Sequence, residues 1–290
     1  MLKRLWRIVL FMAIYSTLIF LMFHYSNFER IHIPLSIASV LGTAISLMLG
    51  FRTNAAYNRW WEARQVWGSI VNDSRTLIRQ ANGFVNKDYA DREAVILKLA
   101  KLQIAFNYAL SNGLRKLSTA RELETYLSEE ERNYVSSQSN HHNAILQLQE
   151  TLLSDIYSKG GMDTYQFTAM DHTLKSHCDS MGKCERIKNT VFPVQYGYYL
   201  RYGLFIFMAL LPFGLIRETG IMVIPISFIV VFFFAIIDAI AKFLQNPFEN
   251  KRGDTPMTAL CRTIEINLLQ MAGQKSVPEA LVPDKRGVLM

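Results

Sequence analysis

The sequence lacks the short motifs that carry the common enzyme chemistries. Its 290 residues contain no G-x-S-x-G nucleophile turn, no G-x-x-x-x-G-K-[ST] phosphate loop, no G-x-G-x-x-G dinucleotide turn and no H-E-x-x-H helix. The apolar segments also contain no paired carboxylates for acid and base catalysis. An enzyme has no candidate catalytic residues in this chain, and we predict that the protein is not one.

Cysteine is scarce as well. The chain has three, Cys178, Cys184 and Cys261. Even with His177 beside them, the first two have a C-x5-C spacing that is not a standard zinc pattern. We therefore predict no metal site.

Charged residues are almost missing from long parts of the chain. The stretches Leu5 to Phe23 and Ile33 to Phe51 are apolar, and the second contains no charge at all. A bilayer core needs about 20 apolar residues per helix, so each stretch is just long enough to span it. A further block, Val191 to Ile237, is interrupted by "PFGLIRETG", which we interpret as a tight turn between two more spans. The sequence predicts an all-α membrane protein with four transmembrane helices.

Basic residues gather beside four ends of the predicted spans. They are Lys3, Arg4 and Arg7 at the first span, Arg52, Arg59 and Arg64 after the second, Arg186 and Lys188 before the third, and Lys242, Lys251 and Arg252 after the fourth. The opposite loops offer only Arg30 and Arg217, each beside a glutamate. By the positive-inside rule, both termini and the middle segment are cytoplasmic. We expect a multi-pass protein of the cell inner (plasma) membrane with reduced cysteines.

The predicted spans divide the chain into four parts. Residues 1–51 form the first transmembrane pair, 52–190 a cytosolic helical domain, 191–241 the second transmembrane pair and 242–290 a cytosolic C-terminal segment. The middle part is predicted to be helical because apolar residues recur every three or four positions in "AVILKLAKLQIAFNYALSNGL". Ser128, followed by three glutamates, predicts a helix start. We interpret His141 and His142, in the polar break "SSQSNHHNAI", as solvated loop residues.

The second span carries two neighbouring sets of residues at four-residue spacing. They are Gly42, Ser46 and Gly50 on one face, and Thr43, Leu47 and Phe51 one residue further round. The small residues allow helices to approach closely. If copies of this helix surrounded an axis, the other set would form stacked rings, and a ring of Leu and Phe is a hydrophobic constriction. Such a stripe is also common in ordinary helix packing, so both interpretations stay open on spacing alone.

The segment "LGFRTNAAYNRWWEAR" resembles the signature of the bestrophin family, in which a pore helix ends in Gly-Phe-Arg. Its signature residues here are Arg52, Asn54, Tyr57, Arg59, Trp60, Trp61, Glu62 and Arg64. Further matches are "LQIAF", "CERI…P…Y", "LPFGL", "NPF" and "TIEINLLQM", so the resemblance covers nearly the whole chain. We expect the signature residues to be structural, with aromatic rings at the membrane interface and arginines on its cytoplasmic side.

The resemblance implies a bacterial bestrophin homologue that forms a homopentamer around a central pore. The pore helix would be residues 33–51, and the neck residues of the family correspond to Thr43, Leu47 and Phe51. The cytosolic vestibule would end in an aperture, which counting back from "CERI" places at Gln166, with Phe167 adjacent.

Animal members of the family bind calcium just after the "NPF" motif. Here the segment reads "NPFENKRGDTPM", in which only Glu249 and Asp254 are acidic and two cations lie between them. Calcium needs about six to eight oxygen ligands. We therefore expect no tight calcium site and no other cofactor.

The function implied by the resemblance is an ion channel that passes monovalent ions, leaning to chloride. A monovalent cation channel of the same architecture stays open, because a hydrophobic neck carries no charge to choose between the two. A non-conducting scaffold or small-solute transporter is the other alternative, although Arg201 and Asp238 lie toward the ends of their spans. We expect sister subunits, membrane lipid and permeant ions as partners, and no nucleic acid despite the net charge of +7.

Overall fold

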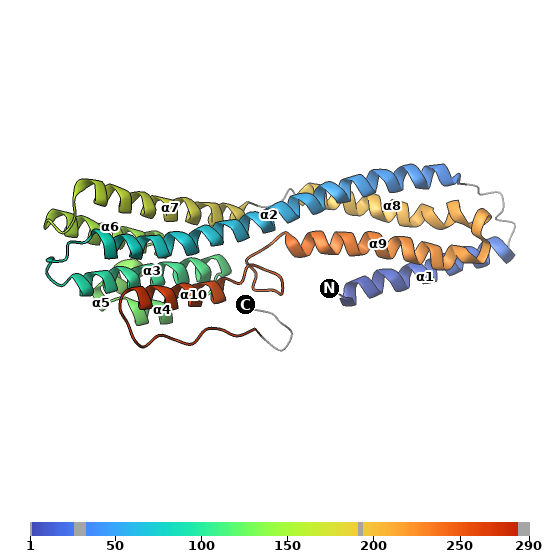
Figure 1. The fold of residues 1–290 in the computed structure, drawn as a ribbon. Coiled ribbons are helices and arrows are strands. Elements are labelled where there is room, and N and C mark those ends of the chain that lie inside the picture. Colours follow the sequence, from blue (N-terminus) through green and yellow to red (C-terminus); the bar gives the residue numbers. More distant parts are fainter. Residues whose placement is uncertain (1, 26–32, 191–193, 284–290) are drawn as a thin grey trace. The chain divides into compact units, whose positions relative to one another are not determined.

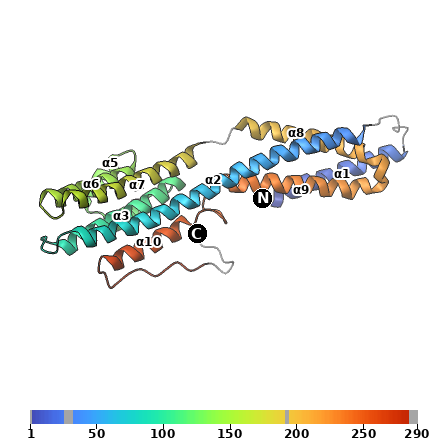
Figure 2. The same cartoon turned by 45° about the horizontal axis from the view of Figure 1, so that its top comes forward.

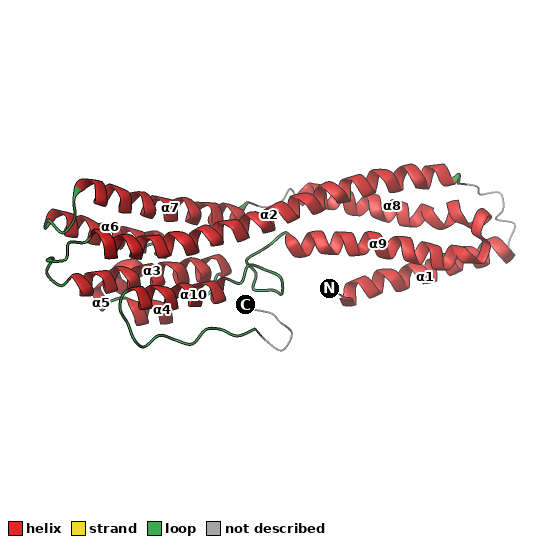
Figure 3. Cartoon of the chain, viewed as in Figure 1, coloured by secondary structure: helices red, strands yellow, loops and turns green. Residues whose placement is uncertain are grey.

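The structure is a computed structural model that describes residues 2–25, 33–190 and 194–283, and every regular element within these ranges is a helix (Figure 1 and Figure 3). The chain divides into two compact units. The first unit comprises Met1–Arg59 and Val191–Gln245, and the second comprises Trp60–Thr190 and Asn246–Met290. Two of these boundaries fall a few residues beyond the expected ones at positions 51 and 241.

The described residues of the first unit form four α-helices. They are α1 (Leu2–Tyr25), the first half of α2 (Leu35–Phe84), α8 (Val194–Thr219) and α9 (Val223–Leu244), with a short 3₁₀ turn, η2 (Gly220–Met222), between the last two (Figure 2). Three described helical runs are long and apolar enough to cross a membrane: Trp6–Tyr25, Leu35–Phe84 and Gln195–Leu244. Arg30, in the loop after the first span, lies outside the described residues. Val191, the predicted start of the third span, lies outside them as well.

The turn between the last two helices comes later than we predicted. Pro212 and the rest of "PFGLIR" lie inside α8, which continues to Thr219. The helix ends at Gly220, whose φ of 54° is the left-handed conformation that glycine adopts without steric cost. The glycine, and not the proline, therefore sets the break.

The core of the first unit is apolar and draws on all four helices. It includes Met12 of α1, Ile45 and Leu49 of α2, Phe207 of α8 and Val231 of α9, each less than 5% exposed. Since this unit exposes large apolar side chains on its outside as well, its helices are apolar nearly all round, as expected of a bundle in lipid.

One face of α2 is buried along the whole helix. Buried residues recur every seven positions, at Leu49, Ala56, Ala63, Ile70 and Leu77. Seven residues make nearly two turns at 3.6 residues per turn, so these side chains share one face. The 50-residue helix thus contributes the same face to the core of both units.

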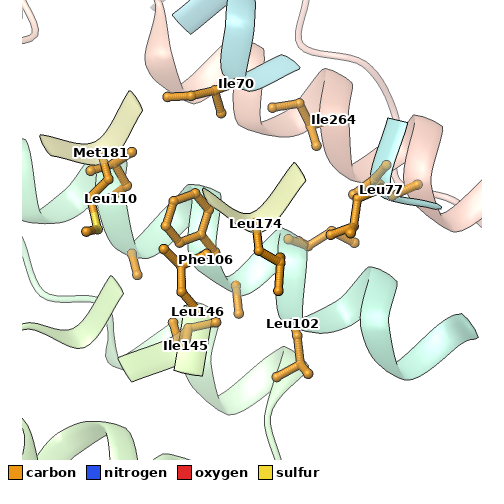
Figure 4. Packing of buried hydrophobic residues seen from close by; sticks show 14 of the residues in the cluster. Ile70, Leu77, Leu102, Phe106, Leu110, Ile145, Leu146, Leu174, Met181 and Ile264 are labelled. Carbon is orange, nitrogen blue, oxygen red and sulfur yellow. The ribbon is translucent and has the colours of Figure 1, made fainter. Parts of the chain in front are cut away.

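The second unit is a helical bundle built around the second half of α2. Its other helices are α3 (Arg92–Arg115), α4 (Ala120–Tyr126), α5 (Glu129–Ser137), α6 (His141–Ser158), α7 (Thr164–Asn189) and α10 (Met257–Met271). Figure 4 shows Phe106 of α3 at the centre of its core, among apolar side chains of α2, α6, α7 and α10. The helical prediction for the middle of the chain is therefore confirmed.

Local capping explains where two of these helices begin. Ser128 starts α5 with a capping box, in which its side chain and Glu131 satisfy each other's backbone N–H groups, as its sequence context predicts. The prediction for the histidine pair was wrong: Asn140 is the N-cap of α6, so His141 and His142 form its first turn. His142 Nε2 lies 2.8 Å from the Glu185 carboxylate, which draws the ring into the bundle.

The second unit also encloses polar side chains. Ser74 Oγ accepts hydrogen bonds from Gln103 at 2.9 Å and Asn107 at 3.3 Å, and Gln149 donates to Gln103 at 3.0 Å. His177 is fully buried, with its ring edge-on to Phe106. Burial lowers the pKa of His177 to about 4 despite the opposing effect of Asp73. The amides and the Ser74 hydroxyl hydrogen-bond to one another, and the low pKa of His177 keeps its ring uncharged in the core.

Candidate functional site

The first candidate site is the face of α2 that the rest of its unit leaves uncovered. Leu47 and Phe51 are 61% and 64% exposed, and Thr43 is exposed one turn earlier. The hydroxyl of Thr43 donates to the carbonyl of Ser39 at 2.9 Å, so its own helix already satisfies it. The stripe therefore offers a largely apolar surface that packing within the single chain does not use.

The small residues beside this stripe serve different purposes. A Cβ on Gly42 would lie 3.1 Å from the ring of Phe207, so this glycine lets α2 and α8 approach closely. Ser46 is exposed and donates back to the carbonyl of Gly42 at 2.8 Å. Gly50 is exposed, and among the described residues nothing lies within 4 Å of an added Cβ. Within the single chain, only Gly42 has the packing role that the sequence predicts.

Arg52, directly after the stripe, is buried in the first unit. Its Nη1 lies 2.6 Å from Oδ1 of Asp238 on α9, and only 8% of its side chain is exposed. Lys242, one turn further along α9, pairs with the other oxygen of the same carboxylate. The expected arginine at the membrane surface is thus part of an internal ion cluster.

The rest of the signature segment is divided between the units. Asn54 and Tyr57 are exposed on the first unit, and Arg59 is half-buried. In the second unit, Trp60 donates from its indole to the carbonyl of Gly253 at 2.7 Å, and the guanidinium of Arg64 lies 5.3 Å above the Trp60 ring.

Two further residues of the segment, Trp61 and Glu62, lie on the surface of the second unit. Trp61 is 47% exposed, and Glu62 forms an exposed ion pair with Arg186 of α7.

The loop after α9 uses its acidic groups internally. Oδ2 of Asp254 accepts the backbone N–H groups of Glu249 and Lys251, each at 2.9 Å. Glu249 pairs with Lys188 of α7 at 2.9 Å, and this hydrogen bond lowers the pKa of the Glu249 carboxyl. Burial raises the pKa of Asp254. Within the described residues, no three His, Cys, Asp or Glu side chains are grouped so that they could hold a metal ion.

The second candidate site is the start of α7, where the sequence predicts an aperture. Asp163 is the N-cap of the helix, and the side chain of Gln166 accepts the N–H of Asp163 at 2.9 Å in a capping box. The ring of Phe167 stacks on Tyr157 at 5.0 Å and packs against the core. Tyr165, one position before Gln166, is 89% exposed. The D-x-x-Q capping pattern "DTYQ" is the signal that distinguishes these positions.

The loop between α2 and α3 holds the segment that leads into this helix. Asn86 donates from its side chain to the carbonyl of Gly160 and from its backbone N–H to the carbonyl of Gly161, each at 2.8 Å. A Cβ on Gly161 would lie 2.6 Å from the ring of Tyr89, so only glycine fits against that ring. Hydrogen bonds from Asn86 and the ring of Tyr89 therefore hold the backbone at Gly160 and Gly161, a few residues before Tyr165.

Comparison with known sequences gives one consistent family. The family model described as Bacterial/Fungal Bestrophin protein matches residues 1–270. The voltage-dependent anion channel-forming protein YneE of Salmonella typhi is 34% identical over 248 residues, which are 86% of this chain and 80% of that protein. The voltage-dependent anion channel-forming protein alr2987 of Nostoc sp. is 34% identical over 245 residues, 82% of this chain and 79% of that protein.

Solved structures agree with the sequence comparison. The crystal structure of a bacterial bestrophin homologue from Klebsiella pneumoniae has a TM-score of 0.86 and 30% identity, and the match covers 92% of this chain and 98% of that one. A single-residue variant of that homologue gives a TM-score of 0.89 at the same identity. The relatives from Salmonella typhi and Nostoc sp. are named as channel-forming proteins, not enzymes, as the missing catalytic motifs predict. The chain is thus a membrane protein and belongs to the bacterial and fungal bestrophin family.

Proposed function

We propose that the protein is a homopentameric ion channel and that α2 lines its pore. The observation that carries the proposal is the uncovered stripe of Thr43, Leu47 and Phe51 on a helix whose opposite face is buried. Five such helices around an axis would place three rings in succession. The family and the names of the relatives support a channel over a packing role for this stripe.

The narrowest part of the pathway is a hydrophobic neck. Leu47 and Phe51 carry no charge, so they oppose ions by excluding water and not by binding. Thr43 gives the outermost ring a methyl group, because its hydroxyl is held by its own helix. This arrangement blocks hydrated ions when narrow and conducts after a small widening.

Each subunit crosses the inner membrane four times, through α1, the first half of α2, α8 and α9. The apolar runs Trp6–Tyr25 and Leu35–Phe84 supply two crossings, and the run Gln195–Leu244 supplies two because η2 divides it. The basic residues at the helix ends support a cytoplasmic location for both termini and the second unit. Sister subunits and lipid cover the exposed apolar surface.

A second constriction forms at the start of α7. The capping box holds the side chain of Gln166 and core packing holds Phe167, whereas Tyr165 extends into open space. Tyr165 is therefore the first of these positions to test as an aperture residue.

The channel works without calcium. Support comes from the loop after α9, where backbone N–H groups occupy Asp254 and Lys188 occupies Glu249. A divalent ion would have to displace these donors to collect the oxygen ligands it needs. Addition of a chelator is expected to leave the current unchanged, and a current abolished by chelator would contradict this part of the proposal.

The test is the reversal potential of the purified protein in planar bilayers under a potassium chloride gradient. We propose an anion channel, following the names of the relatives, so the reversal potential should lie near the chloride equilibrium potential. A value near the potassium equilibrium potential would establish the cation channel instead. Saturable flux without unitary steps would favour a transporter, and no flux in pentameric protein would favour a scaffold.

The neck is tested with a matched pair of variants. Replacing Leu47 and Phe51 together by alanine should raise the unitary conductance, because it removes both apolar rings. Ile229 and Phe233 of α9 are a similar exposed pair four residues apart, 52% and 63% exposed, and serve as the control. Their alanine variant should conduct as the wild type does, and an equal rise in both variants would contradict the neck assignment.

A further inference from the structure

The buried ion cluster lies directly beside the proposed neck. Arg52 follows Phe51 in sequence, yet its side chain is 8% exposed whereas Phe51 is 64% exposed. Neighbouring residues on a helix are rotated by about 100° from each other, so the two side chains leave α2 in different directions. A contact that fixes the direction of one also fixes the direction of the other.

Two helices hold the guanidinium of Arg52 in place. Asp238 of α9 lies 2.6 Å from its Nη1. On the side of α8, a Cβ added to Gly197 would lie 3.8 Å from its Nη2, so the group lies against the α8 backbone. Tyr196, the residue before Gly197, donates from its hydroxyl to the carbonyl of Met48 at 2.8 Å. Met48 lies one turn before Arg52 on α2. The inner end of the pore helix is thus hydrogen-bonded to α8 once and ion-paired with α9 once.

Neutralising Asp238 does not require Arg52. Lys242 pairs with the same carboxylate from the next turn of α9, and 35% of its side chain is exposed. A buried arginine is costly to desolvate, and an apolar residue of similar volume often stabilises a fold as well or better. An apolar side chain does not fix the orientation of the helix in the same way. The planar guanidinium of arginine pairs with a carboxylate in only a few orientations, whereas apolar contact has no preferred direction.

We infer that Arg52 is a positioning residue for the neck, and that its ion pair with Asp238 sets the rotation of α2 at which Phe51 narrows the pore. This inference rests on the proposed channel function. Without the ion pair, the inner end of α2 turns more freely, the Phe51 ring occupies the axis for less of the time, and the barrier to ions falls.

The experiment is a double-mutant cycle of unitary conductance in pentameric protein. Arg52→Ala should raise the conductance about two- to fivefold, toward the low end of the range expected of residues that bias a two-state element. In the Phe51→Ala background, the same change should add little, because the ring through which Arg52 acts is gone. The charge swap Arg52→Asp with Asp238→Arg should bring the conductance back toward the wild-type value. Arg217→Ala, an exposed arginine at the far end of α8, is the control and should change nothing.

The outcomes separate this inference from the proposed function. Wild-type pentamers without unitary current would overturn the channel itself. Conducting wild type with an unchanged Arg52→Ala variant, or an effect of equal size with and without Phe51, would overturn the positioning role alone. If Arg52→Ala yields no pentamers, Arg52→Lys takes its place in the cycle. Lysine keeps the charge but not the planar geometry, so a smaller rise is expected, and no rise contradicts the inference.

Discussion

The two units each enclose a carboxylate but satisfy it with different donors. Asp238 in the first unit faces two cations, Arg52 and Lys242. Glu265 in the second unit accepts hydrogen bonds from two tyrosine hydroxyls, those of Tyr108 at 2.6 Å and of Tyr126. Burial and these hydrogen bonds raise the pKa of both tyrosines, so they remain neutral donors. Loss of the acid strands a buried arginine in the first unit. In the second unit it leaves two neutral hydroxyls and Arg262, whose Nε lies 3.4 Å from Oε2 of Glu265 and whose side chain is 30% exposed.

The units differ as well in where their large apolar side chains lie. Phe51 and Phe233 are mostly exposed in the first unit, whereas Trp67 and Phe106 are fully buried in the second. Lipid and sister subunits can cover the exposed rings of the first unit, but water cannot do so at low cost. Large apolar side chains are thus found on the outside of the first unit and in the core of the second. Substitutions of the same kind should therefore change the stability by different amounts in the two units.

The largest difference is expected for phenylalanine. Phe106→Ala leaves a cavity at the centre of the second unit and should lower the free energy of unfolding by about 3–5 kcal/mol. Phe51→Ala removes a ring that makes little contact within its chain, so the stability of the subunit should change by less than about 1 kcal/mol. Thermal unfolding in detergent measures both, and equal losses would show that Phe51 is packed in the assembled protein.

The second effect is a pH dependence that arises in the second unit. The pKa of His177 is about 4 in the folded protein against an ordinary value of 6.5, so the unfolded chain binds the proton more readily between these values. Stability should fall as the pH drops from 6.5 to 4 and level off below, with a total loss of about 3 kcal/mol.

The control for this prediction is His177→Leu, which cannot be protonated. The difference in unfolding temperature between wild type and variant should change across this pH window and be constant above it. A constant difference over the whole range would show that the ring finds a way to bind the proton in the folded state.

The third comparison uses the two enclosed acids. Asp238→Asn leaves Arg52 without an anionic acceptor and should cost about 2–3 kcal/mol, since hydrogen bonds to charged groups are worth more. Glu265→Gln keeps an oxygen for one tyrosine but removes the charge that faces Arg262. Because the side chain of Arg262 is 30% exposed, the cost should be smaller, about 1–2 kcal/mol. Denaturation of the two variants side by side measures the two losses of stability. The reverse order would mean that the tyrosine hydrogen bonds contribute more to the free energy of unfolding than the ion pair does.

The smallest effect is expected on the surface. Glu62 and Arg186 form an ion pair whose side chains are 40% and 63% exposed. Solvent screens such pairs, so Glu62→Gln should change the stability by less than about 0.5 kcal/mol. A loss several times larger would indicate that a sister subunit covers this pair in the assembly.

Much of the fold is accessible from local sequence pattern. The four-residue spacing of Thr43, Leu47 and Phe51 identifies one face of a helix, and the structure leaves that face exposed. The N-cap at Ser128 is likewise a matter of four consecutive residues. Helix periodicity and capping depend on near neighbours, which is why sequence alone predicts them.

The rest depends on contacts between distant residues. Arg52 pairs with Asp238 across 186 positions, and His142 with Glu185 across 43, so no local pattern reveals either pair. The turn at Gly220 was misplaced because a proline is tolerated inside the apolar helix α8. The exposure of Tyr165 follows from the capping register of α7, which counting back from a motif without gaps does not take into account.

Buried positions recur every seven residues along α2. The direction in which a side chain leaves the helix therefore depends on the number of residues that separate it from the buried positions before it. A single inserted residue would turn every side chain after it by about 100° relative to those before it. Seven inserted residues would restore the original direction to within about 20°. An insertion of seven residues therefore disturbs the pattern of buried positions along α2 far less than an insertion of one residue does.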